Sequence, residues 1–95
     1  NRKITDEGLK TLKTLPQLTE LNLGSCDITK HGLEHLADLP HLKRLNLAYC
    51  GRLTGTVTKP LRQLARLEYL DLLGCLHIPR SSVAKIERRG LTIRV

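Results

Sequence analysis

The chain repeats itself along its length. A segment with the pattern LxxLxLxxC occurs three times, at residues 18–26, 42–50 and 67–75, and successive copies are 24 and 25 residues apart. A period of this size is typical of solenoid proteins, whose units are too small to bury their apolar side alone and are stable only when stacked. We therefore expect a row of stacked units.

The residues between these segments repeat as well. An apolar residue lies 14, six and three positions before the first leucine of every segment. These residues are Ile4, Ile28 and Leu53, then Leu12, Leu36 and Leu61, and finally Leu15, Leu39 and Leu64. Agreement at three distances excludes simple leucine richness, with 21 leucines in the chain, as the explanation.

Each unit contains two different apolar periods. In Leu21-Asn22-Leu23 apolar and polar residues alternate, which is the period of a β-strand because successive side chains point to opposite faces. Within residues 8–15 and 32–39 the leucines are three apart, which places them along one stripe of a helix. Each unit is therefore predicted to run strand, turn, helix, turn, with parallel strands in one layer and helices in the other.

This period divides a single domain, residues 1–95, into units. They are a partial first repeat at 4–17, repeats at 18–41, 42–66 and 67–90, and a closing strand at 91–95. Spacing alone leaves open whether Ile93 or Val95 takes the position of Leu70. The first unit has only its helical half, and an open solenoid end exposes leucines. We expect the rest of a parent chain or a second copy to cover that end.

The composition excludes two classes of protein. Binders of single-stranded nucleic acid need several exposed aromatic side chains, whereas this chain has two Tyr and no Phe or Trp. Proteins that cross a bilayer by a helix need an apolar run of roughly 18 residues, and no run approaches that length.

These motifs resemble the leucine-rich-repeat family, and within it the cysteine-containing subclass. The resemblance is carried by residues 18–26 and by the Ile28-Thr29, Gly32-Leu33 and Leu39-Pro40 pairs that follow. It implies an α/β fold, a right-handed solenoid with parallel strands on the concave side and helices on the convex side. It also implies that the Cys side chains turn inward and satisfy backbone groups, which fits reduced thiols in an intracellular, cytoplasmic protein.

Short repeats of this kind are similar to those of F-box-type substrate receptors of ubiquitin ligases and of bacterial effectors that enter host cells. The resemblance therefore implies a protein-interaction module that holds a protein substrate on its concave side. No F-box-like helical stretch lies outside the repeats, so the chain is expected to be only the substrate-recognition part.

One segment matches a metal motif. His31-x-x-Glu34-His35 has the HxxEH pattern of inverted zincins, with Glu68 or Glu87 as an imaginable third ligand. The same residues are explained as the helix of the second unit, and an outer helical wall offers no cleft that excludes water. No Gly-rich phosphate loop is present, and no serine is placed with a histidine and an acid. We predict no enzyme, no metal and no cofactor.

The candidate binding residues alternate with the core leucines of the strands and therefore point to the concave side. They are Glu20, Asn22, Arg44, Asn46, Tyr69, Asp71 and, from the closing strand, Thr92 or Arg94. Concave sheets of solenoids serve for binding, and Tyr and Arg are enriched among residues that dominate binding energies. The predicted partner is another protein, contacted chiefly by Tyr69 and Arg44. A solvated surface without a ligand is the competing interpretation.

The charge offers an alternative binding surface. The net charge is +7, and residues 48–95 hold nine Lys and Arg against three Asp and Glu, whereas residues 1–47 hold seven against six. Six basic residues are expected on the third and fourth helices and could form one convex patch: Lys59, Arg62, Arg66, Lys85, Arg88 and Arg89. Such a patch could bind nucleic acid or anionic lipid, or it could be an ordinary solvated helix face.

Overall fold

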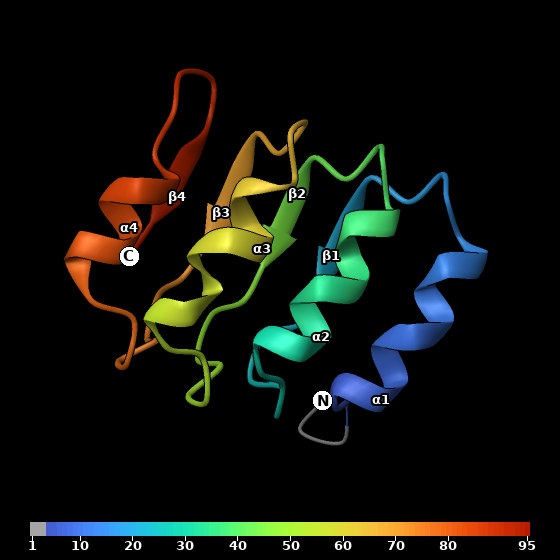
Figure 1. Cartoon of the computed structure of the whole chain (residues 1–95), viewed down its shortest axis with the longest axis horizontal. Coiled ribbons are helices and arrows are strands. Elements are labelled where there is room, and N and C mark those ends of the chain that lie inside the picture. The colour runs from blue at the N-terminus through green and yellow to red at the C-terminus, as the bar shows by residue number, and fades with distance from the viewer. Residues whose placement is uncertain (1–3) are drawn as a thin grey trace.

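Four short parallel strands lie side by side in chain order in the computed structural model, which describes residues 4–95 apart from the side chain of Lys13 (Figure 1). They are β1 Glu20–Asn22, β2 Arg44–Asn46, β3 Tyr69–Asp71 and β4 Thr92–Arg94. Their central residues share one level of the sheet, with Leu21 beside Leu45, Leu45 beside Leu70, and Leu70 beside Ile93. Ile93 and not Val95 therefore takes the position of Leu70.

The helical segments combine α-helix with 3-10 helix. In the described part of the chain, α1 Asp6–Leu9 continues into η1 Lys10–Thr14, α2 Lys30–Glu34 continues into η2 His35–Asp38, η3 Gly55–Val57 leads into α3 Thr58–Arg62, and α4 is Arg80–Ile86. A leucine spacing of three fits a 3-10 helix, with about 3.0 residues per turn, better than an α-helix with about 3.6. None of the helices within residues 4–95 is long and apolar enough to cross a membrane.

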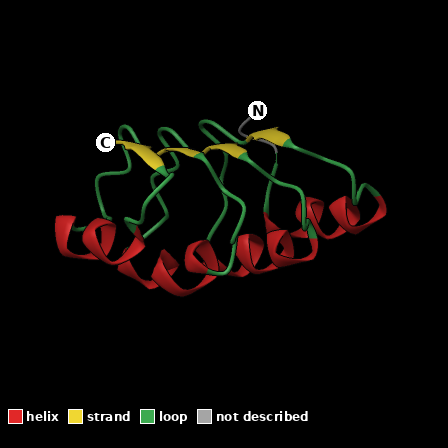
Figure 2. Cartoon of the chain, turned by 90° about the horizontal axis from the view of Figure 1, so that it is seen from above, coloured by secondary structure: helices red, strands yellow, loops and turns green. Residues whose placement is uncertain are grey.

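Strands and helices form two separate layers (Figure 2). The row of helices follows a longer arc than the row of strands, so the helical side is convex and the strand side is concave (Figure 2). At one end of the array α1 extends beyond β1, and no strand of residues 4–95 lies beside it on that side (Figure 1). The predicted fold class, an α/β solenoid with parallel strands and an outer layer of helices, is confirmed.

The core is a stack of equivalent leucines between the two layers. Leu45 and Leu70 from the strands, and Leu36 and Leu61 from the helical segments, have no exposed surface. Burying a leucine side chain stabilises a fold by roughly 1.5–3 kcal/mol. Here each leucine is covered mainly by the leucine at the same position in the neighbouring unit. Each unit therefore depends on its neighbours for its core.

The cysteines connect successive units through their thiols. Cys50 Sγ donates a hydrogen bond to the carbonyl oxygen of Leu23 over 3.0 Å, and Cys75 Sγ donates to that of Leu47 over 3.0 Å. Each thiol thus satisfies a carbonyl at the end of the preceding strand. Burial raises the pKa of the Cys50 thiol from 9.0 to about 11, and burial likewise raises the pKa of Cys75.

Raising the pH from 9.0 to about 11 is expected to lower the free energy of unfolding through Cys50. Below this window both states keep the proton and the stabilisation is complete. Within it the unfolded chain loses its proton first, so stability falls by up to about 1.4 kcal/mol per pH unit. Urea unfolding at a series of pH values measures this slope, and a Cys50→Ala variant should show a flatter profile. Parallel profiles for the two proteins would mean that this thiol does not carry the effect.

Candidate functional site

Two rows of side chains cross the concave side of the sheet. The first row is Glu20, Arg44, Tyr69 and Thr92, and the second row is Asn22, Asn46, Asp71 and Arg94, each in the order of the paired strands. The residue between them on each strand, such as Leu45, points into the core. The strand alternation expected from the sequence thus places all predicted concave residues on two neighbouring levels. Both Thr92 and Arg94 lie there.

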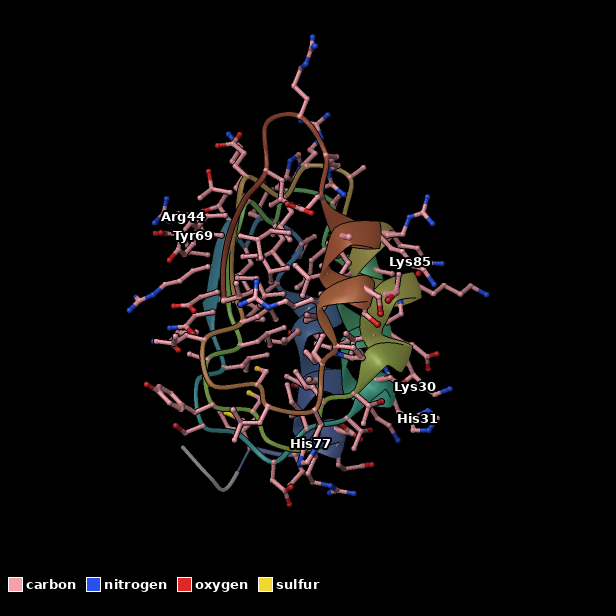
Figure 3. The ribbon with its side chains drawn as sticks, turned by 90° about the vertical axis from the view of Figure 1, so that its left-hand side faces the viewer. Lys30, His31, Arg44, Tyr69, His77 and Lys85 are labelled. Carbon is pink, nitrogen blue, oxygen red and sulfur yellow. The ribbon has the colours of Figure 1, made fainter. Side chains whose placement is uncertain are left out.

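The first row is organised around Arg44. Arg44 Nε lies 3.2 Å from Glu20 Oε1, and Arg44 Cζ lies 4.8 Å from the centre of the Tyr69 ring. A guanidinium over an aromatic face is attracted by about 0.5–1 kcal/mol at an exposed site. The Arg44 side chain nevertheless remains 57% exposed, and Figure 3 shows Arg44 and Tyr69 together on the strand side of the molecule. The carboxylate and the ring therefore orient a cation that is still accessible.

A shallow open hollow of about 400 Å³ lies over these strands. It is lined by the first-row residues Glu20, Arg44 and Tyr69, the second-row residues Asn22 and Asn46, and the strand leucines Leu21 and Leu45. Its floor is the sheet and its walls are long polar side chains. Such a hollow accepts the protruding side chains of a partner better than it encloses a small molecule, because ligand sites for small molecules bury most of the ligand surface.

Each residue of the second row is the last residue of its strand. In the first three members of this row the side-chain Oδ1 accepts a hydrogen bond from the backbone N–H two residues later. Asn22 accepts from Gly24 over 2.9 Å, Asn46 from Ala48 over 2.8 Å, and Asp71 from Leu73 over 2.9 Å. Asn and Asp favour such local turns because their short side chains reach their own backbone. The side-chain oxygens of this row therefore have a structural role that strand alternation did not reveal.

Asp71 differs from the other predicted contact residues because it is buried, with 6% of its surface exposed. Its Oδ2 lies 3.7 Å from Arg94 Nη1, which covers it, while Oδ1 holds the turn. The prediction that Asp71 is an accessible contact residue is wrong, because its neighbours take up both carboxylate oxygens. Arg94 itself remains on the surface.

Sequence analysis missed one exposed aromatic residue, Tyr49, in the loop after β2. The residue before each cysteine has a positive φ: 59° at Ser25, 62° at Tyr49 and 76° at Gly74. Tyr49 is 61% exposed, and its ring covers Gly74 so closely that a Cβ there would lie 2.3 Å from the ring. The glycine in this position of the third segment was the available signal for the left-handed turn. A large exposed aromatic held in a strained backbone is a candidate contact residue.

The predicted convex patch of six basic residues does not form as expected. α3 ends at Arg62 and α4 ends at Ile86, so Arg66, Arg88 and Arg89 lie outside both helices. Arg88 is half-buried and donates hydrogen bonds to the carbonyl oxygens of Leu64 and Leu67. The placement of these three arginines on helices is wrong, because the chain turns back toward the sheet soon after each helix. Arg88 stabilises one of these turns.

The other three basic residues do come together. Lys59, Arg62 and Lys85 line an open groove of about 610 Å³ between α3 and α4, with Gly55, Thr56, Thr58 and Gln63. No acidic residue is among this described lining, so the groove attracts anions. Lys85 points away on the helical side, opposite Arg44 and Tyr69 (Figure 3).

The HxxEH segment lies on the helical side. His31 belongs to α2, where its Nδ1 lies 3.6 Å from Glu34 Oε1, and His35 begins η2. Within residues 4–95 no three His, Cys, Asp or Glu side chains gather in a way that could hold a metal ion. The segment is explained by one surface pair on a helix.

Comparison with known sequences agrees with this architecture. A sequence model described as leucine rich repeat matches residues 16–76, which is more than half of the chain. A comparison with curated proteins finds no match. Domains of this type generally mediate protein–protein interaction and are typically not enzymes. The matched residues include three of the four strands and the repeated leucines of the core, and the chain belongs to the leucine-rich-repeat family.

Proposed function

We propose that the chain binds a protein partner on its concave strand face, with Arg44 and Tyr69 at the centre of the contact. The main support for this proposal is the arrangement of Arg44. Its side chain is oriented by the Glu20 carboxylate and the Tyr69 ring, yet more than half of its surface is exposed. An ordered side chain loses little rotamer freedom when it binds, and this favours affinity.

The sheet supports this arrangement from below. β2 and β3, which carry Arg44 and Tyr69, lie between β1 and β4 and have no free edge. Leu45 and Leu70, their central residues, are fully buried. The contact residues therefore stand on strands that are paired on both sides and packed on the core, and the exposed Tyr49 adds a further aromatic surface in the loop after β2.

The class of partner and the cellular location are proposed from the resemblance to F-box-type receptors and bacterial effectors and from the state of the cysteines. We propose that the partner is a substrate recruited to a ubiquitin ligase receptor or a host protein bound by a bacterial effector. Cys26, Cys50 and Cys75 are all buried as free thiols. Unpaired buried cysteines support a reducing, intracellular environment, with the cytoplasm as the proposed location.

Replacing Arg44 and Tyr69 together by alanine is expected to weaken partner binding by about 100-fold, because truncating two such residues typically removes around 2–3 kcal/mol or more. The partner is first captured from a nuclease-treated cell lysate on the immobilised chain at physiological salt and identified by mass spectrometry. The dissociation constants of the purified proteins are then measured by titration calorimetry. Asp71 is left unchanged, since its removal would disturb the turn after β3.

The matched control is Lys59→Ala/Lys85→Ala, which also removes two exposed side chains but on the convex side. It should leave partner affinity unchanged, and both variants should keep the thermal unfolding temperature of the parent. Equal affinity of parent and Arg44→Ala/Tyr69→Ala would contradict the concave site.

The convex groove supports a second candidate function, binding of nucleic acid or anionic lipid. Its three cations, Lys59, Arg62 and Lys85, make no ion pair with a carboxylate among the described residues, which leaves them available. If this function is correct, Lys59→Ala/Lys85→Ala should lose binding of the anionic ligand, whereas Arg44→Ala/Tyr69→Ala should keep it. The logarithm of the affinity should then fall with the logarithm of salt concentration with a slope of about −3 for three phosphate contacts.

A further inference from the structure

The hollow of about 400 Å³ on the concave side is lined by side chains that still have hydrogen-bond donors to offer. We propose that it receives an acidic side chain of the protein partner, whose carboxylate is bound by Arg44 and by the side-chain amides of Asn22 and Asn46. This inference rests on the proposed function of the concave face, and it adds the chemistry of the group that is bound there.

The turns after β1 and β2 fix the orientation of the two amides. Asn22 Oδ1 accepts the Gly24 N–H over 2.9 Å, and Asn46 Oδ1 accepts the Ala48 N–H over 2.8 Å. A side-chain amide accepts through its oxygen and donates through its nitrogen, so only the oxygen can meet a backbone N–H. The Nδ2 groups remain, and neither of them donates a hydrogen bond to another described residue. Each asparagine therefore presents an unused N–H donor group.

The two amides are neighbours across the sheet. Asn22 is paired with Asn46 in the register of β1 and β2, and paired strands lie about 4.8 Å apart. At this spacing each oxygen of a single carboxylate can accept a hydrogen bond from one of the two amides. Asn22 is exposed, Asn46 is partly buried, and both line the hollow. The pair is thus arranged for an acceptor with two oxygens.

Arg44 adds a positive charge beside the amides. It lies two residues before Asn46 on β2 and therefore on the same face of the sheet. Its Nε lies 3.2 Å from Glu20 Oε1, and its Cζ lies 4.8 Å from the centre of the Tyr69 ring. The ring contacts the face of the guanidinium, so the Nη groups keep their N–H donors in the plane. A carboxylate is the group that a guanidinium binds best in this plane.

Other partner side chains fit these donors less well. A lysine ammonium has only donors, and it would face both amide N–H groups and the Arg44 cation. The carboxylate within the described lining, that of Glu20, is already paired with Arg44. A neutral carbonyl could accept from the amides, but its hydrogen bond to a cation is weaker than that of a carboxylate. An Asp or Glu side chain therefore satisfies all three donors.

The third unit provides a natural substitution at the position of the asparagines. Asp71 is paired with Asn46 in the register of β2 and β3, and its Oδ1 accepts the Leu73 N–H over 2.9 Å, just as the asparagines hold their own turns. The position therefore tolerates either an amide or a carboxylate without loss of the turn. Asn46→Asp is for this reason a variant that changes the donor and keeps the fold.

Heteronuclear NMR of the full chain tests the proposal, because the chain has few side-chain amides, those of Asn1, Gln17, Asn22, Asn46 and Gln63. The probe is the tripeptide acetyl-Gly-Asp-Gly-amide at neutral pH, and acetyl-Gly-Asn-Gly-amide is the comparison without a carboxylate. The Asp peptide should shift the Nδ2 signals of Asn22 and Asn46 to saturation, with an affinity about tenfold or more above that of the Asn peptide.

Gln63 reports attraction by net charge alone. Its side chain lines the convex groove with Lys59, Arg62 and Lys85, so a peptide drawn to any cation would shift its amide signal as well. This signal should stay unchanged at the peptide concentration that saturates Asn22 and Asn46.

Asn46→Asp should weaken binding of the Asp peptide by about tenfold or more, because a hydrogen bond to a charged acceptor is replaced by repulsion between two carboxylates. Gln63→Glu is the matched control, since it makes the same change of charge on the convex side and should leave the affinity unchanged. Urea unfolding checks that both variants keep the stability of the parent.

Equal affinity for the two peptides, an absence of shifts at Asn22 and Asn46, or equal shifts at Gln63 would overturn the proposal. Binding of the Asp peptide by Asn46→Asp at the affinity of the parent would do so too. The proposed function is judged separately, by the affinity of the captured partner for Arg44→Ala/Tyr69→Ala. A loss there, together with equal affinity for the two peptides, would uphold the concave site and reject only the acidic side chain as its occupant.

Discussion

Leu45→Ala is expected to lower the free energy of unfolding by about 3–4 kcal/mol, a large share of the roughly 5–15 kcal/mol that stabilises a domain of this size. Leu45 has no exposed surface and lies between Leu21 and Leu70 in the sheet. Its removal leaves a cavity shared by two units, which neighbouring side chains cannot fill without leaving their own positions. Urea unfolding followed by circular dichroism measures the change.

The matched control is Leu21→Ala, the same position one unit earlier. Leu21 is only partly buried, since β1 has a neighbour on one side. Its truncation should cost about 1–2 kcal/mol. Equal losses at both positions would mean that the stacking of units does not determine the contribution of each leucine.

Gly74→Ala is expected to destabilise the protein by about 2–4 kcal/mol, for two separable reasons. The φ of Gly74 is 76°, where a Cβ costs about 1–2 kcal/mol, and the new methyl group would lie 2.3 Å from the Tyr49 ring, which adds the cost of overpacking. Gly90→Ala isolates the first reason, because Gly90 has a φ of 87° but open space around its Cβ position.

The contribution of the ring is measured by the double variant. In a Tyr49→Ala background, Gly74→Ala should cost only as much as Gly90→Ala in the parent. If the cost of Gly74→Ala is the same with and without the ring, the contact between Tyr49 and Gly74 carries no energy, and Tyr49 is then free to serve binding alone.

The errors of sequence analysis at the candidate site have a common cause. The sequence pattern predicts Asp71 and Arg88 as surface residues, because a strand position and a helix position of this kind point outward. In the structure Asp71 accepts the Leu73 N–H and lies beside Arg94, while Arg88 donates to carbonyl groups of the preceding turn. Both residues stabilise turns, Asp71 the turn after β3 and Arg88 the turn between α3 and β3, and strand or helix periodicity does not predict the path of a turn.

The repeat pattern is sufficient to predict the unit, the parallel sheet, the leucine core and the direction of the concave side chains. It could do so because a period of 24 to 25 residues repeats, and because alternation in a strand assigns each side chain to one face. The contacts between side chains of different units become visible only in the folded chain. Arg44 over Tyr69, Cys50 on the Leu23 carbonyl and Tyr49 over Gly74 all join residues about one repeat apart. Such contacts depend on the spacing of stacked strands and on loop conformation, and these follow from packing rather than from local pattern.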